Sequence, residues 1–299
     1  MVMGLVMEDS MMLSNAPKIV KHQSSIQFSF HFLKVHIFND KAWVQLAAPP
    51  LNILNNEMQI EITSVFHQLK MRKDISVISL SAQGNNFCSG INIKEIFQGL
   101  EFGKGLKFCL DFARMLDAIA AVNKPILGFI KGYAFGAGAT LAALCDYSIA
   151  APNAKFSYPE RKIGLKPSVS LPYLIPRMGN LAIFPFLSGK IWNAQEALKF
   201  KLIDEICGDK NKLIVKKKSL LKQFSNSPMR LNRSFIPQKN NITLDMDFSL
   251  KNYFESIKRI YPNRTEEGRE MLIQYTAQDL FNDLSKPLAL ELFSRYFKH

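Results

Sequence analysis

The sequence predicts an α/β core followed by a helical C-terminal part. Short apolar or β-branched runs alternate with longer segments whose apolar residues recur at helical spacing. Strands that alternate with helices in this way indicate an α/β core with right-handed crossovers, and after residue 210 only helical periods remain. Ligands of such folds bind where strand ends meet helix starts, so these junctions are the first places to search for a functional site.

Each expected element follows from its local pattern. The first two strands, 35–38 and 42–46, flank the turn residues Asn39 and Asp40 and so indicate a hairpin. The later strands are short apolar runs at 75–80, 125–130, 147–150, 154–157 and 202–206. The helices expected from the apolar period are 57–70, 102–122, 137–145, 171–178, 181–188, 193–199, 210–224, 246–261, 266–284 and 288–297, and a further helix can start within 90–97.

The pattern divides the chain into three regions. Residues 1–27 carry five methionines and a polar tail, and they lack the basic start, the long apolar segment and the cleavage site of a secretory signal, so we expect an unstructured arm. Residues 28–225 form the expected core. Residues 226–299 form a helical C-terminal region.

Composition excludes several classes of protein. With 47% hydrophobic and 21% charged residues the chain has an ordinary globular composition, and no apolar stretch is as long as a membrane span, so we expect no membrane association. The four cysteines lack the paired spacing of a disulfide framework or a zinc site. This fits a reducing, cytoplasmic compartment.

A net charge of +13 comes largely from basic residues between positions 210 and 239. A phosphate-bearing ligand or an acidic carrier protein would use such a surface. A solvated helix face that only aids solubility is the commoner explanation of a charge run. Nucleic acid is not an expected partner, because no zinc-finger, helix-turn-helix or RNA-binding aromatic motif accompanies the charge.

The stretch from Pro125 to Asp146 contains the clearest strand-to-helix junction. Glycines at 132, 136 and 138 relax the backbone between an apolar run and the expected helix. The first N–H groups of a helix have no intrahelical partner and can stabilise an oxyanion. Close packing of small residues at a buried turn explains the same pattern about equally well.

The usual catalytic motifs are missing from the sequence: it has no nucleophile elbow, no Walker loop, no dinucleotide-binding glycine spacing and no metal-ligand cluster. Two strand-to-helix turns remain, 89–91 and 136–138, with Glu160 on a loop beyond them. One N–H donor from each turn can hold a carbonyl oxygen as it becomes an enolate, at about 3 to 4 kcal/mol per donor, while the glutamate moves a proton. On pattern alone, Glu160 equally fits a surface ion pair with Arg161 or Lys162.

Five blocks of the sequence, taken together and in order, carry a family resemblance: 50–54, 86–95, 124–146, 156–164 and 187–204. They resemble the crotonase superfamily of acyl-thioester enzymes, which includes enoyl-CoA hydratases and isomerases. The resemblance implies a crotonase-like spiral of ββα units, with a helical C-terminal trimerisation region that builds homotrimers or hexamers. It also implies an acyl-CoA or acyl carrier protein thioester as substrate, and no cofactor beyond the CoA or phosphopantetheine part of that substrate.

The resemblance assigns roles by position. Ile91 and Ala137 correspond to the two oxyanion-hole N–H donors, and Glu160 to the catalytic acid/base. The residues that the resemblance assigns to substrate binding are Ser89, Asn92 and Lys94, near the adenine or phosphate end of CoA, together with Gly136 and Thr140.

Thr140 is the informative departure from the family pattern. Hydratases of this family commonly have a glutamate there and a second one at the position of Glu160, and this chain keeps only the second. One carboxylate suffices for a double-bond shift, as in the isomerase branch, or for the dehydratases of polyketide β-branching, which 160–179 resembles. Residues 46–54 resemble the branch that hydrates dienoyl-CoA thioesters. We therefore expect (de)hydration or a double-bond shift, with a non-catalytic thioester-binding or scaffold protein as the alternative.

Overall fold

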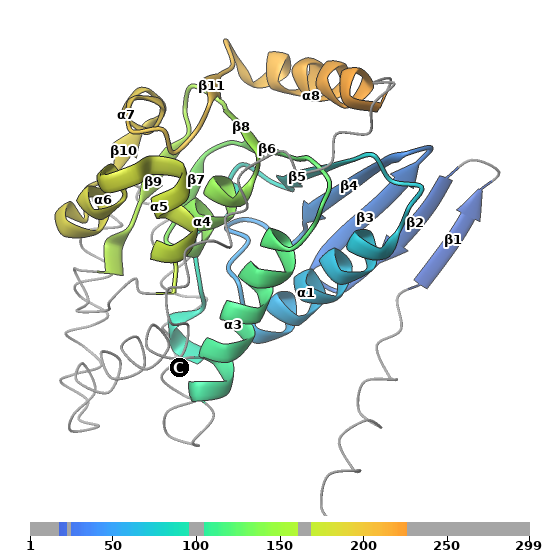
Figure 1. Ribbon diagram of the computed structural model, residues 1–299, viewed down its shortest axis with the longest axis horizontal. Helices are drawn as coiled ribbons and strands as arrows, with labels where there is room; N and C mark the ends of the chain where they lie inside the picture. The colour runs from blue at the N-terminus through green and yellow to red at the C-terminus, as the bar shows by residue number, and fades with distance from the viewer. Residues whose placement is uncertain (1–17, 23–24, 96–104, 161–168, 226–299) are drawn as a thin grey trace, which may run out of the picture.

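An eight-stranded mixed sheet organises the computed structural model, which describes residues 18–22, 25–95, 105–160 and 169–225 (Figure 1). The strands, in their order across the sheet, are β1 (Lys18–His22), β2 (Ser25–Ser29), β3 (Leu33–Phe38), β4 (Lys41–Leu46), β5 (Val77–Ala82), β6 (Ile126–Ile130), β8 (Tyr147–Ala150) and β11 (Glu205–Ile206). Neighbours from β1 to β4 are antiparallel, whereas β4, β5, β6, β8 and β11 run parallel. An antiparallel N-terminal half therefore joins a parallel half built from crossovers.

A smaller, three-stranded sheet receives the chain from the parallel half. Its strands, in the order β10-β9-β7, are β10 (Trp192–Asn193), β9 (Lys155–Ser157) and β7 (Tyr133–Phe135). β7 follows β6 and leads into α4 (Ala137–Leu144), and β9 follows β8 and leads toward α5 (Leu171–Met178). This repeated strand–strand–helix order confirms the expected ββα units, and it places the start of α4 at the end of β7.

Helices cover both faces of the large sheet (Figure 1). α1 (Asn56–Met71) and α3 (Gly105–Ala120) pack on one face, and α8 (Lys210–Ser225) packs on the other. Alternate residues of β5 point to the two sides, so that Ile78 belongs to the main core with α1 and α3, and Val77 to a smaller core under α8. The remaining helical segments are η3 (Gly179–Ala182, a 3-10 helix), α6 (Ile183–Ser188) and α7 (Ala194–Lys199).

Asparagine caps fix where α1 and α7 begin. Asn55 Oδ1 accepts the Met58 N–H at 2.7 Å. Asn193 Oδ1 accepts the Glu196 N–H at 2.9 Å, while the Glu196 carboxylate accepts the Asn193 N–H at 3.0 Å. Each cap satisfies a donor that the helix leaves unpaired, and a cap of this kind is worth about 1 kcal/mol.

Two strands occupy part of the segment expected to be an unstructured arm. β1 pairs with β2, and β2 pairs along its whole length with β3. The expectation for residues 1–27 is therefore wrong at 18–22 and 25–27, because pairing satisfies the main-chain hydrogen-bonding groups of β2 and those of β1 that face β2. The alternation of Ile26 and Phe28 with polar residues is the sequence signal for β2.

Elsewhere the element boundaries differ by a few residues. The expected strand 202–206 is reduced to β11, because the Leu202 N–H bonds back to Ala197 O at 2.9 Å, at the end of α7. The expected helix 181–188 is divided between η3 and α6. β7 and β10 are not among the expected strands, since two or three residues are too few for an alternation to show. The expected loop after Glu160 and the helices beyond residue 225 lie outside the described residues.

Lys217 of α8 reaches into the smaller core. Its Nζ donates to Ser81 Oγ at 2.9 Å and lies 5.5 Å from the centre of the Phe129 ring. Burial, together with the nearby charge of Lys131, lowers the pKa of Lys217 to about 8. The ammonium form therefore costs stability at neutral pH.

Lys217→Met is expected to remove a pH dependence of stability. The pKa of Lys217 is lower in the folded than in the unfolded chain, so wild-type stability is reduced at neutral pH and recovers as the pH rises through 8 toward 10. Allowing for partial exposure, we expect the wild type to gain roughly 1 to 2 kcal/mol relative to the variant between pH 7 and pH 10. Urea unfolding at both pH values measures this gain. Lys218→Met, on the exposed face of α8, is the matched control, and the same pH dependence in all three proteins would contradict the prediction.

Candidate active site

Helix α4 begins at the tight turn that follows β7. Gly136 has a φ of +50°, a conformation that favours glycine, and its N–H donates to Ser157 O at 2.8 Å. The Thr140 N–H makes the first helical hydrogen bond, to Gly136 O at 3.1 Å. The Ala137 N–H precedes that bond, and no described residue accepts from it. The start of α4 therefore presents an N–H group that is available to a ligand.

The loop that carries Ile91 is held by a short parallel bridge. Leu54 N–H donates to Gly90 O, and Leu54 O accepts from the Asn92 N–H, both at 2.8 Å. These bonds use the two neighbours of Ile91, so the Ile91 N–H points away from Leu54. Within the described part of the chain, no acceptor bonds to it.

The Ile91 loop and the start of α4 meet backbone to backbone. Cys88 O accepts from the Phe135 N–H at 2.9 Å, and a Cβ placed on Gly138 would lie 2.0 Å from that same oxygen. A Cβ on Gly90 would lie 3.0 Å from Phe135 O and 3.8 Å from Ala137 N. Only glycine at position 138 permits this approach, which brings the loop against the first turn of the helix.

Glu160 lies beside the same helix start. A Cβ placed on Gly136 would be 2.9 Å from Glu160 Oε1. The residue as a whole is half-buried, but its Oε2 is buried and has no hydrogen-bond partner among the described residues. Burial raises the pKa of Glu160 to about 7, although a hydrogen bond to its own backbone acts in the opposite direction. A carboxyl group with this pKa can accept and donate a proton near neutral pH.

Thr140 and Tyr158 bring two buried hydroxyl groups together next to Glu160. Thr140 Oγ1 donates to Gly136 O at 3.2 Å and lies 3.4 Å from the Tyr158 hydroxyl. Burial raises the pKa of Tyr158, which keeps its hydroxyl protonated at neutral pH. In the described part of the cluster formed with Gly136, Glu160 is the only carboxylate.

The three residues expected near the CoA end lie on the Ile91 loop or directly after it. Asn92 Nδ2 donates to Glu95 Oε1 at 3.1 Å, and its Oδ1 accepts the Lys94 N–H at 3.2 Å. Glu95 Oε2 in turn accepts the Asn56 N–H at 2.7 Å, so the Asn92 side chain helps to anchor the loop to α1. Lys94 is exposed, and Ser89 Oγ is buried with no partner in the described residues.

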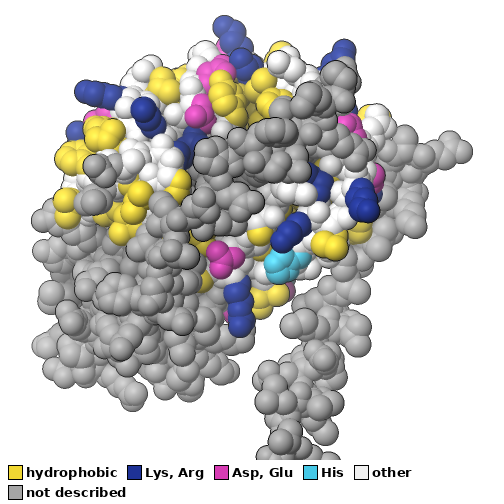
Figure 2. Space-filling model, viewed as in Figure 1, with side chains coloured by type: hydrophobic (Ala, Val, Ile, Leu, Met, Phe, Trp, Pro, Cys, Tyr) yellow, Lys and Arg dark blue, Asp and Glu magenta, His cyan; other side chains and the backbone are white. Residues whose placement is uncertain are grey.

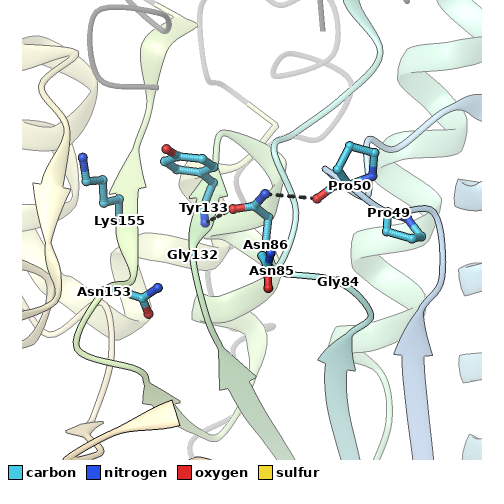
Figure 3. A pocket seen from close by; sticks show the side chains of 9 residues that line it. All are labelled: Pro49, Pro50, Gly84, Asn85, Asn86, Gly132, Tyr133, Asn153 and Lys155. Carbon is cyan, nitrogen blue, oxygen red and sulfur yellow. Dashed lines mark hydrogen bonds between the residues drawn. The ribbon is translucent and has the colours of Figure 1, made fainter. Parts of the chain in front are cut away.

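Two buried asparagines that the motifs do not single out fix the neighbouring loops. Asn52 Nδ2 donates to Gln83 O at 3.0 Å and to Asn86 O at 2.9 Å. Figure 3 shows the Asn86 carboxamide between two backbones: it donates to Pro50 O at 3.0 Å and accepts the Tyr133 N–H at 3.1 Å. Carboxamides that satisfy several backbone groups hold these strand ends in fixed positions. Asn52 and Asn86 both lie in sequence blocks that carry the family resemblance. Their hydrogen-bond partners are distant in the sequence, so the sequence alone does not predict these contacts.

A pocket of about 450 Å³ opens at the carboxyl ends of the parallel strands (Figure 3). It is lined by Pro49, Pro50, Gly84, Asn85, Asn86, Gly132, Tyr133, Asn153 and Lys155. None of the expected site residues lines it. The pocket lies at the start of β7, whereas the cluster around Glu160 lies at its end.

The described residues hold no group of three His, Cys, Asp or Glu side chains placed to bind a metal ion. Among the helices described here, none is both long and apolar enough to cross a membrane.

Residues 39–261 match the sequence model of the enoyl-CoA hydratase/isomerase family. The chain belongs to this family. The matched range of this enoyl-CoA hydratase/isomerase family member includes the Ile91 loop, the start of α4 and Glu160, which confirms the resemblance to the crotonase superfamily. The expected trimerisation region lies outside the described residues.

Known proteins similar to this family member include hydratases. A probable enoyl-CoA hydratase of Mycobacterium leprae is 34% identical over 158 residues, which span 52% of this chain and 60% of the relative. The (E)-benzylidenesuccinyl-CoA hydratase of Thauera aromatica is 30% identical over 183 residues, 58% of this chain and 68% of that protein. The crystal structure of an enoyl-CoA hydratase from Bacillus halodurans aligns with a TM-score of 0.70 at 22% identity, over 81% of this chain and 98% of that one. The fold is therefore of the crotonase type.

Proposed function

We propose that this family member is an enzyme that acts on an acyl thioester through an enolate, with Glu160 as its single acid/base. The observation that carries the proposal is the Glu160 carboxyl, whose Oε2 is buried and without a described partner. It lies beside a helix start whose first N–H group is unpartnered in the described residues. Buried groups with a raised pKa at such a junction are typical of catalytic acids and bases.

In this mechanism the N–H groups of Ile91 and Ala137 bind the thioester carbonyl oxygen. The Glu160 carboxylate takes a proton from the adjacent α-carbon, and the C–H electron pair forms an enolate whose oxygen both donors stabilise. For a 3-enoyl thioester, Glu160 returns the proton to the γ-carbon and completes a double-bond shift. For a 3-hydroxyacyl thioester, it protonates the departing hydroxyl, and water leaves. Either route restores the carboxylate.

Thr140 supports a double-bond shift or a dehydration rather than hydration by two carboxylates. A second carboxylate next to Glu160 would orient and activate water. Its place in the family pattern is taken by Thr140, whose hydroxyl bonds to Gly136 O and lies near the Tyr158 hydroxyl. Neither hydroxyl is a base at neutral pH.

The proposed carrier of the acyl group is CoA or an acyl carrier protein, with no further cofactor. The exposed Lys94 supports a contact with a phosphate group. Lys212, Lys218 and Lys222 of α8 are exposed, and Figure 2 shows basic side chains along the upper edge of the molecule, where α8 lies in Figure 1. This surface supports an acidic carrier protein. A homotrimer or hexamer belongs to the same proposal and rests on the family resemblance.

Exchange of α-protons with deuterium oxide tests the proposed function. We expect butyryl-CoA, which has α-protons but no reaction to complete, to incorporate deuterium in the presence of the protein. The rate should rise with pH through about 7, as Glu160 ionises, and then level off. Mass spectrometry measures the incorporation. Crotonyl-CoA, a 3-enoyl-CoA and carrier-bound hydroxymethylglutaryl thioester, assayed side by side, then identify the reaction and the carrier.

A non-catalytic thioester-binding or scaffold protein is the second candidate, because Thr140 stands where hydratases of the family have a carboxylate. Tight binding of butyryl-CoA with no exchange between pH 5 and pH 9 would establish that role and refute the enzyme.

A further inference from the structure

Tyr158, two positions before Glu160 in the sequence, contacts both α4 and α6. Its hydroxyl lies 3.4 Å from Thr140 Oγ1 of α4. Its ring packs against the Phe186 ring of α6, with centroids 4.4 Å apart and planes at 59°. Only 1% of the residue is exposed. The proposed chemistry assigns no step to this side chain, although it carries a polar group into the protein interior beside the acid/base.

The direction of the hydrogen bonds follows from the acceptor at their end. Gly136 O can only accept, so the Thr140 hydroxyl donates to it, and the Tyr158 hydroxyl must then donate to Thr140 Oγ1. These two hydrogen bonds connect Tyr158, in the segment that carries Glu160, to Gly136, whose missing Cβ leaves space for Glu160 Oε1. Both ends of this series of hydrogen bonds thus lie at the start of α4.

Apart from a hydrogen bond to its own backbone, no described contact holds the Glu160 carboxyl in place. Its Oε2 lacks a described hydrogen-bond partner, and a buried carboxylate gains solvation by turning toward water. Arg177 of α5 lies near enough to lower the pKa of Tyr158 slightly against the larger effect of burial, but its guanidinium is bonded to Asp204 and to the carbonyl oxygens of Cys145 and Leu202. Arg177 is therefore engaged elsewhere.

We infer that Tyr158 is a positioning residue, which holds the Glu160 carboxyl against the start of α4 through its hydrogen bond to Thr140 and its packing on Phe186. The consequence for catalysis rests on the proposed function, whereas the placement of the carboxyl does not.

Tyr158→Phe separates the hydroxyl from the ring, because the variant keeps the packing on Phe186. Burial is what raises the pKa of Glu160, so release of its carboxyl should lower that pKa from about 7 by about one unit or more. Infrared difference titration with carboxyl-labelled glutamate, and Glu160→Gln as the spectral blank, measures the pKa without any substrate. In the exchange assay we expect kcat to fall about tenfold, with KM changed less than twofold. Thr140→Val, which removes the acceptor, should reproduce the pKa shift, and Thr140→Ser should restore the wild-type value.

Tyr173→Phe is the matched control. Tyr173 is also a buried tyrosine, and its hydroxyl donates to Asp117 Oδ1 of α3 at 2.5 Å. Loss of the Tyr173 hydroxyl should lower the melting temperature and leave the pKa of Glu160 unchanged. An unchanged titration in Tyr158→Phe, or the same shift in Tyr173→Phe, overturns the positioning role. A shift in Tyr158→Phe alone supports that role, even if no protein exchanges α-protons, in which case the proposed function fails instead.

Discussion

Glu160→Gln is expected to abolish turnover, with α-proton exchange slowed by about 1000-fold or more. Glutamine matches glutamate in size but cannot carry the proton between substrate atoms. The N–H groups of Ile91 and Ala137 remain in place, so the dissociation constant of butyryl-CoA should change only a few-fold. Deuterium incorporation measures the first effect, and calorimetric titration with butyryl-CoA measures the second.

Measurements of thermal stability show whether the loss of turnover in Glu160→Gln results from unfolding. The folded-state pKa of Glu160 lies above that of an ordinary carboxyl, so its stabilising contribution is complete in acid and is lost as the pH rises through about 7. The glutamine variant should therefore melt at or above the wild-type temperature at pH 8, and the difference should vanish toward pH 4. Glu57→Gln, at an exposed carboxylate of α1, is the matched control and should keep full activity. Exchange within tenfold of the wild type in Glu160→Gln would assign the proton transfer to another residue.

Gly138→Ala is expected to reduce both stability and turnover. The new Cβ would lie 2.0 Å from Cys88 O and 2.8 Å from Cys88 C, and these backbone atoms cannot rotate away as a side chain does. The Ile91 loop must therefore move away from α4, at a cost of about 3 kcal/mol in the free energy of unfolding. Displacement of one N–H donor should lower kcat by a further ~100-fold. Urea unfolding and the exchange assay, run below the unfolding midpoint, report the two effects separately.

Gly208→Ala provides a glycine-to-alanine control. A Cβ there would meet only the Lys212 side chain, 3.3 Å from its Cδ, and that flexible chain can move aside. We expect a change of at most about 0.5 kcal/mol and full activity. Wild-type stability in Gly138→Ala would show that Cys88 is not held against α4.

Most described helices and strands follow from local signals in the sequence. The turn at Asn39 and Asp40 lies between β3 and β4 as expected, and the apolar period of 57–70 predicts α1 to within one residue at each end. β7 could not be found in this way, because three residues become a strand only by pairing with β9, whose sequence position is distant. β1 is a different case, because its partner β2 begins only three residues after it ends.

The residues of the candidate site also differ in whether a local sequence signal predicts them. Motif spacing and family resemblance point to Ile91, Ala137 and Glu160, because the chemistry requires a donor or a carboxylate at those positions. The roles of these three residues stay predictions. Contacts made across the fold carry no local signal, and the hydrogen bond of Tyr158 to Thr140 is one of them.

The four residues at the start of α4, which precede Thr140, contain no side-chain torsion angle between heavy atoms. Gly136, Ala137, Gly138 and Ala139 are all buried, and glycine and alanine have no rotamers. A carbonyl oxygen that binds there orders no side chain, whereas fixing a long side chain costs up to about 2 kcal/mol in conformational entropy. In the proposed mechanism Ile91 and Ala137 act through backbone N–H groups, and only Glu160 acts through a side chain. The entropic cost of assembling the site is therefore concentrated in one glutamate, and the protein reduces it by fixing that residue before the substrate arrives.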